Sequence, residues 1–135
     1  MAWLVVLSFF LNLLWENVQA PLYAGYRSFT QHFWLCFWAT IGDIVIIFFL
    51  YLLMSLCRKD MFWIRKMQVS DGVVLVVVGL VLGVANELLA LAFGRWWYTA
   101  AMPLLPWYHV GLWPVLQLLL LPLLTFYLVK KIIYH

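Results

Sequence analysis

The stretch NELLALAFGRWWYTAAMPLLP, residues Asn86–Pro106, decides how this chain is interpreted. Asn86 and Glu87 open it, inside an apolar run over residues 73–93 that is long enough to cross a bilayer. Beyond that run the chain continues through the aromatic segment Arg95–Tyr98 and two prolines. A carboxylate within a membrane span is costly and usually marks a functional site. The stretch therefore predicts a membrane protein with a polar site near one end of a helix.

The rest of the chain repeats this composition. Of its 135 residues, 68% are hydrophobic and only 10% are charged, which is far from the average of soluble proteins. Apolar runs of membrane-spanning length recur and predict four spans. We expect an all-α, polytopic membrane protein, a four-transmembrane-helix bundle in which residues 1–135 form one integral-membrane domain. The expected spans cover residues 2–19, 33–56, 73–93 and 113–129.

The first apolar run raises the alternative of a cleaved signal peptide. It has no basic start, and it carries Asn12 and Glu16 in its core with Pro21 just beyond. These features favour a retained first span.

Basic residues predict the orientation. Six of the eight Lys and Arg residues fall in the 57–72 loop or in the C-terminal tail, whereas Arg27 and Arg95 lie in the other two loops. The positive-inside rule then places both termini in the cytoplasm. We expect a bacterial inner membrane. The net charge of +3 is explained by this topology and does not indicate nucleic-acid binding.

Polar residues follow one face of each expected helix. Spacings of three and four residues bring side chains to the same helical face. The four stripes are Ser8, Asn12, Glu16 and Gln19; His32, Cys36, Thr40 and Asp43; Gly79, Gly83, Glu87, Ala90 and Gly94; and Pro114, Gln117, Leu121 and Thr125. At about 1.5 Å per residue, Glu16, Asp43, Glu87 and Gln117 reach the outer half of the bundle. We expect the three carboxylates to converge there, with Arg95 and His109 able to close over them.

Small residues and cysteines add further expectations. Gly79 and Gly83 predict close helix packing, and Gly42 beside Asp43 predicts the close approach of a neighbouring backbone. Cys36 and Cys57 are separated by about 31 Å of helix, too far for a disulfide, so free thiols are expected.

The candidate residues have both functional and structural interpretations. Glu16, Asp43 and Glu87 are candidate catalytic residues. The candidate substrate-binding residues are Asn12, Trp15, Gln19, Asn86, Arg95, Trp96, Tyr98, His109 and Gln117. Structurally, protonated acids hydrogen-bonded to amides can join helices. The Trp-Trp-Tyr run is also typical of an aromatic belt at the membrane interface, where an arginine or a histidine is ordinary.

A metal site is the weaker alternative. His32, Cys36, Asp43 and His109 can be assembled into one on paper, but no pair has a recognised ligand spacing. No metal and no other cofactor is therefore expected.

Several motifs resemble those of known proteins. The chain resembles small bacterial four-helix membrane proteins of unassigned function, and the resemblance covers most of it. Its motifs are Trp15-Glu16-x-x-Gln19-x-Pro21-Leu22-Tyr23, Gly42-Asp43, Gly94-Arg95-Trp96-x-Tyr98-x-x-x-Met102-Pro103-x-x-Pro106 and Val110-Gly111-Leu112-x-Pro114-x-x-Gln117. More distantly, Glu87–Pro106 is similar to lycopene-cyclase-type membrane domains, although the paired acids that follow the proline in those domains are missing here.

Three functions fit these features. The first is an intramembrane enzyme acting on a lipid or isoprenoid, with Glu87 or Glu16 as general acid and another carboxylate as base. Aromatic rings of Trp15, Trp96 and Tyr98 would stabilise developing positive charge. The second is a proton-coupled small transporter or channel, expected to be a homodimer. The third is an accessory subunit of a membrane complex.

Overall fold

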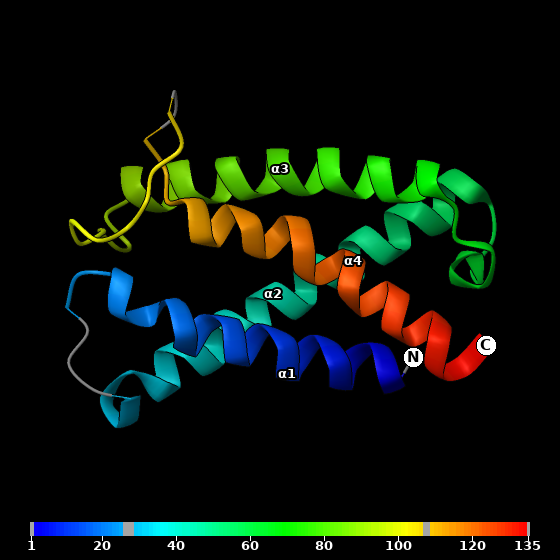
Figure 1. Ribbon diagram of the computed structural model, residues 1–135, viewed down its shortest axis with the longest axis horizontal. Coiled ribbons are helices and arrows are strands. Elements are labelled where there is room, and N and C mark those ends of the chain that lie inside the picture. The colour runs from blue at the N-terminus through cyan, green and yellow to red at the C-terminus, as the bar shows by residue number, and fades with distance from the viewer. Residues whose placement is uncertain (1, 26–28, 107–108, 135) are drawn as a thin grey trace.

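The computed structural model describes residues 2–25, 29–106 and 109–134. Within these residues, four helices are long and apolar enough to cross a membrane. They are α1 (Ala2–Gln19), α2 (Phe29–Arg58), α3 (Val69–Ala92) and α4 (Leu112–Tyr134), joined by the short 3₁₀ helices η1 (Ala20–Leu22) and η2 (Trp63–Lys66) (Figure 1). The predicted all-α membrane bundle of four helices is confirmed.

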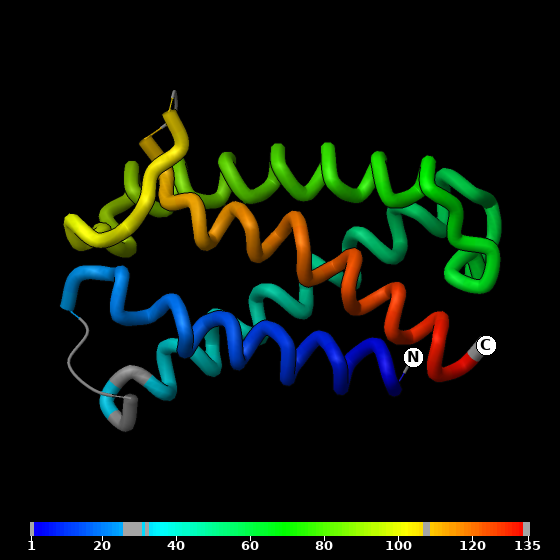
Figure 2. Tube along the Cα trace, in the orientation of Figure 1, coloured from blue at the N-terminus to red at the C-terminus, as the bar shows by residue number. Residues whose placement is uncertain are grey.

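The four helices run antiparallel in chain order. Both termini and the connection between α2 and α3 lie at one end, which we call the basic end because it holds six of the eight Lys and Arg residues (Figure 1). The other two connections form the opposite end, called the aromatic end. α1 packs against α2 and α4, and α3 packs against α4. α2 and α3 approach each other at the basic end and diverge towards the aromatic end (Figure 2).

Helix ends follow local sequence signals. α1 ends before Pro21, which lacks the backbone N–H that a continuing helix needs. α3 begins with a capping box, in which Gln68 and Asp71 each bond the other's backbone. It ends at Ala92 and is followed by Phe93 and by Gly94, whose φ of +67° permits a Schellman turn. The turn is closed by the bond from Arg95 N–H to the Ala90 carbonyl, 2.8 Å.

The contact between α3 and α4 depends on two glycines. A Cβ placed on Gly79 would lie only 2.4 Å from the Leu118 carbonyl oxygen, and one on Gly83 would lie 3.3 Å from the Val115 Cα. Pro122 lies inside α4 and has no N–H to donate to that Leu118 carbonyl. The backbones of α3 and α4 therefore touch at the Leu118 carbonyl, which lacks the hydrogen bond that an N–H at position 122 would donate within the helix. The predicted close packing at these glycines is confirmed.

Gly42 behaves differently from the prediction. Nothing lies within 4 Å of a Cβ built on it, so no neighbouring backbone approaches α2 there. The expectation was wrong because the face of α2 that carries Gly42 borders open space. The missing side chain enlarges that space instead of admitting a helix.

A compact apolar core fills the basic end. Trp63 of η2 is fully buried and packs edge-on against Phe126 of α4, with ring centroids 5.2 Å apart. Its indole N–H donates to the Tyr51 carbonyl at 3.2 Å. Leu4 and Leu75 complete the contact from α1 and α3. The connection between α2 and α3 thus folds back into the core and fills this end of the bundle.

Both cysteines are free thiols, as predicted. Cys36 is buried and Cys57 is exposed.

Candidate functional site

Gln117 lies at the centre of a polar cluster between α1, α2 and α4. Its side-chain Nε2 lies 3.0 Å from Asn12 Oδ1, 3.0 Å from Glu16 Oε1 and 2.7 Å from Asp43 Oδ2. Gln117 and Asn12 are 3% and 1% exposed, so water does not supply alternative partners for them. Glu16 and Asp43 approach the same nitrogen, so the structure brings these two carboxyl groups together.

The amides of this cluster form a chain with a fixed direction. The indole N–H of Trp15 can only donate, and it reaches Gln19 Oε1 at 3.1 Å. Gln19 must then present its NH₂ group, which lies 3.2 Å from Glu16 Oε2 and 3.1 Å from Gln117 Oε1. Gln117 in turn presents its own NH₂ group to the acids. The Trp15 N–H also reaches the Trp113 carbonyl at 3.2 Å, and its contact with Gln19 is consistent with this orientation of both amides.

The cluster has more acceptors than hydrogens. The NH₂ group of Gln117 carries two hydrogens but faces three acceptor oxygens, from Asn12, Glu16 and Asp43. A proton carried by one carboxyl and shared with the other would supply the missing donor. The geometry thus suits a carboxyl pair that holds one exchangeable proton.

Glu87 has a separate set of partners. Its carboxyl is 2% exposed and accepts hydrogen bonds from the Trp96 indole N–H, at 2.9 Å, and from the Tyr98 hydroxyl. Both donors meet the same oxygen, Oε2. Burial and the bond to Glu87 raise the pKa of Tyr98 above its ordinary value, so this phenol stays a donor at neutral pH. The Tyr98 ring rests on Gly111, where a Cβ would lie 3.1 Å from it.

Two loops pair to form a roof at the aromatic end. Ala24 N–H donates to the Trp97 carbonyl and Thr99 N–H to the Leu22 carbonyl, both at 2.8 Å. Tyr23 and Tyr98 form the antiparallel bridge between them. The Tyr23 ring also contacts the Trp96 ring edge-on, with centroids 5.9 Å apart. The α1–α2 connection and the segment after α3 thus cover the polar cluster together.

A cavity of about 610 Å³ lies under this roof. All four helices and both roof loops contribute to its wall. The polar and aromatic side chains on the wall are Glu16, Gln19, Tyr23, Cys36, Asp43, Asn86, Glu87, Arg95, Trp96, Trp97 and Gln117. Ala39 and Gly42 on α2 and Asn86 on α3 are wall residues that are also exposed. These exposed wall residues place the opening of the cavity between α2 and α3. The two helices diverge towards the aromatic end (Figure 2).

The predicted site residues occupy three kinds of position. On the cavity wall lie Glu16, Gln19, Asp43, Asn86, Glu87, Arg95, Trp96 and Gln117. Asn12, Trp15 and Tyr98 bond to wall residues from behind and hold them in place. His109 is exposed with a φ of +53° and is absent from the described wall, so the structure lends no support to the expectation that it closes over the acids.

The metal alternative gains no support from this arrangement. Among the described side chains, no three of His, Cys, Asp or Glu gather where they could hold an ion. Cys36 and Asp43 share the cavity wall, His109 lies away from it, and the side chain of His32 lies outside the described residues.

Several residues of the cavity wall were not predicted from the sequence. Tyr23 and Trp97 line the cavity, as do Ala39 and Gly42 on α2. Tyr23 belongs to the quoted Pro21-Leu22-Tyr23 motif, which was a usable signal. The α2 residues gave no polar signal, because their contribution is a lack of side-chain volume.

Comparisons of this chain with protein-family models, with curated proteins and with solved structures found no match.

Proposed function

We propose that this protein is an intramembrane enzyme that acts on a lipid or isoprenoid substrate by carboxylic acid–base chemistry. The observation that carries the proposal is the roofed cavity on whose wall Glu16, Asp43 and Glu87 all lie. Buried acids in a membrane span are costly and usually functional. Here they border open volume, whereas acids that only join helices would be enclosed by their partners.

The direction of access supports a lipid substrate. The paired loops cover the cavity at the aromatic end, and the opening between α2 and α3 faces the hydrocarbon. Exposed apolar side chains flank this opening, with Leu35 64% exposed on α2 and Leu89 57% exposed on α3. A molecule dissolved in the bilayer reaches the acids through this opening without crossing water.

The chemistry follows from the two carboxyl environments. The Glu16–Asp43 pair is the proposed general acid, and Glu87 is the proposed base. Glu87 is anchored through Oε2, which leaves Oε1 for the cavity that the residue lines. In an alkene isomerisation, the pair would protonate one carbon of the double bond and leave the positive charge on the other carbon. Glu87 would then remove a proton from the next carbon along the chain, so that the double bond shifts by one position. The Trp96 ring would stabilise the intermediate positive charge. Hydration, cyclisation and hydrolysis use the same groups.

A proton-coupled transporter is the second candidate, since the Glu16–Asp43 pair resembles a site that exchanges a proton with a cation. Transport needs access from both ends of the bundle. The apolar core around Trp63 and Phe126 fills the basic end among the described residues. This barrier favours the enzyme.

The orientation is part of the proposal. The concentration of Lys and Arg at the basic end supports placing both termini in the cytoplasm. In a bacterial inner membrane the acids would then lie in the outer half of the bilayer.

Lipid mass spectrometry tests the enzyme function. Cells expressing the wild type, Glu16→Gln and Glu87→Gln at matched membrane levels would be compared. We expect one lipid species to appear or vanish only with the wild type. Asn17→Ala is the control, because the bond that Asn17 makes among the described residues is to the Leu13 carbonyl of its own helix, and Asn17 lies off the described wall. Lipid profiles that do not differ between the wild type and the acid variants would refute the enzyme.

A further inference from the structure

A second hollow lies at the basic end, away from the acids. It is a groove of about 560 Å³ between the start of α3 and the end of α4. Its floor is apolar, built by Val73, Val76 and Val77 of α3 with Leu123 of α4. Gly72 also lines the groove, and because it has no side chain it leaves space there; a Cβ on it would lie 3.8 Å from Leu123.

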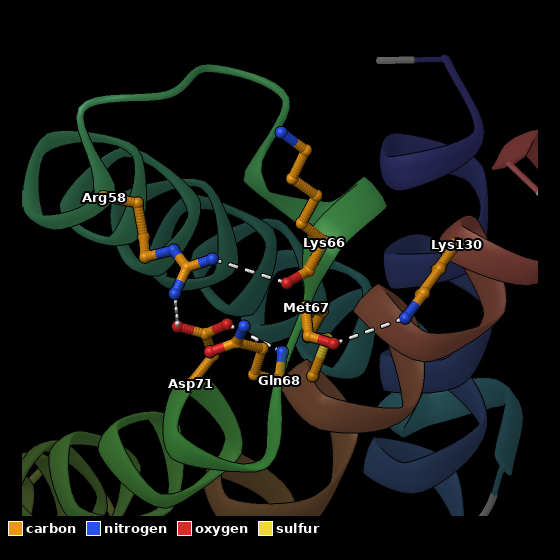
Figure 3. Close-up of polar contacts among 6 residues, drawn as sticks. All are labelled: Arg58, Lys66, Met67, Gln68, Asp71 and Lys130. Carbon is orange, nitrogen blue, oxygen red and sulfur yellow. Dashed lines mark hydrogen bonds and ion pairs between the residues drawn. The ribbon is translucent and has the colours of Figure 1, made fainter.

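One lysine lines this groove and a second lies beside a ring that lines it. Lys130 lines it, and its ammonium donates one hydrogen bond to the Met67 carbonyl at 3.3 Å (Figure 3). An ammonium group has three hydrogens, so two remain for a ligand. The ammonium of Lys131 lies 5.1 Å from the ring centroid of Tyr127, which also lines the groove. Positive charge is therefore concentrated where the apolar floor ends.

The acid closest in sequence to this groove is already neutralised. Asp71 is 3% exposed and pairs with Arg58 at 3.5 Å, while its second oxygen accepts the Gln68 backbone N–H (Figure 3). Within the part of the chain that the structure describes, neither groove lysine has a carboxylate partner. The charge of the two lysines is thus uncompensated.

We infer that this groove binds a membrane phospholipid with an anionic headgroup. One acyl chain would lie along the valines, and the phosphate would accept hydrogen bonds from Lys130 beside Lys131. Basic pockets between transmembrane helices are suited to anionic headgroups, because charge and apolar surface meet at the depth of the phosphates. The inference does not depend on the proposed enzymatic function.

Native mass spectrometry tests this inference on the full chain. The protein would be released from nanodiscs that contain equal amounts of phosphatidylglycerol and phosphatidylcholine with the same acyl chains. We expect the wild type to retain phosphatidylglycerol preferentially. Lys130→Gln should reduce that preference about fivefold, the contribution of one lysine near the membrane surface. Lys130→Arg should retain it.

Lys66→Gln is the matched control. It removes the same charge from the same end, but the Lys66 side chain extends away from Lys130 (Figure 3). Lys131→Gln is the second variant, useful if loss of the Met67 contact impairs folding. A local site predicts a loss in the Lys130 and Lys131 variants and none in Lys66→Gln. Equal losses in all three, or no preference in the wild type, would overturn the inference.

Discussion

The contact between α3 and α4 gives a sharp stability prediction, because the chain contains two glycines of opposite environment. In Gly79→Ala, the new methyl group would lie 2.4 Å from the Leu118 carbonyl oxygen, a backbone atom that cannot rotate away. The helices must separate, and overpacking of this kind costs about 1–3 kcal/mol. In Gly42→Ala, nothing lies within 4 Å of the new methyl group. Replacing a helical glycine by alanine there should be neutral or stabilising by up to about 1 kcal/mol.

The assay is reversible unfolding of both variants in the same detergent or bicelle, followed by circular dichroism. The two alanine variants should differ by at least about 1 kcal/mol in the free energy of unfolding, with Gly79→Ala the less stable. The comparison cancels the general preference of helices for alanine over glycine. Equal stabilities would refute the reasoning that the backbones of α3 and α4 touch at Gly79.

Three further predictions concern the polar groups. Gln117→Leu should destabilise the protein by about 2 kcal/mol in the same unfolding assay. Three intramembrane hydrogen bonds are lost at about 0.6 kcal/mol each, two donated by the NH₂ group of Gln117 and one accepted from Gln19. An unchanged stability would contradict the central position of Gln117 in the polar cluster. Gly111→Ala should displace the Tyr98 ring and thereby reduce catalytic turnover of the lipid substrate, whereas Gly42→Ala should fold normally. Full turnover by Gly111→Ala would show that the bond from Tyr98 to Glu87 is dispensable. The pKa of Tyr98 is raised in the folded protein, so its stabilising contribution should be complete below the unfolded value of about 10 and be lost as the pH rises above it. Tyr98→Phe should weaken this alkaline loss of stability, measured as the melting temperature against pH, and an unaltered profile would assign the loss to other groups.

The fold was largely predictable because its determinants are local. Apolar runs of membrane length identified all four helices, and Pro21 correctly ended α1. The remaining boundaries differ by up to five residues. α2, for example, extends beyond the expected 33–56 at both ends because no proline or glycine interrupts it there.

The site was predictable only in part, because periodicity shows which residues share a helix face but not which neighbour that face meets. The polar stripes correctly brought Glu16 and Asp43 towards Gln117. They gave no indication that α2 and α3 diverge, so Gly42 was assigned to a helix contact when it borders the cavity. The position of Trp63 was also unpredictable, since it depends on how a connecting loop folds back into the core.

The most direct test of the central claim uses purified protein. Wild type, Glu16→Gln, Glu87→Gln and the control Asn17→Ala would be reconstituted into liposomes made from extracted membrane lipids, and the lipids followed by mass spectrometry over time. We expect the wild type and Asn17→Ala, which keeps every acid and lies off the described wall, to convert one lipid species, and the two acid variants to fail to do so. Conversion at the wild-type rate by both acid variants, or no conversion by folded wild-type protein, would contradict the claim that these carboxylates act on a lipid.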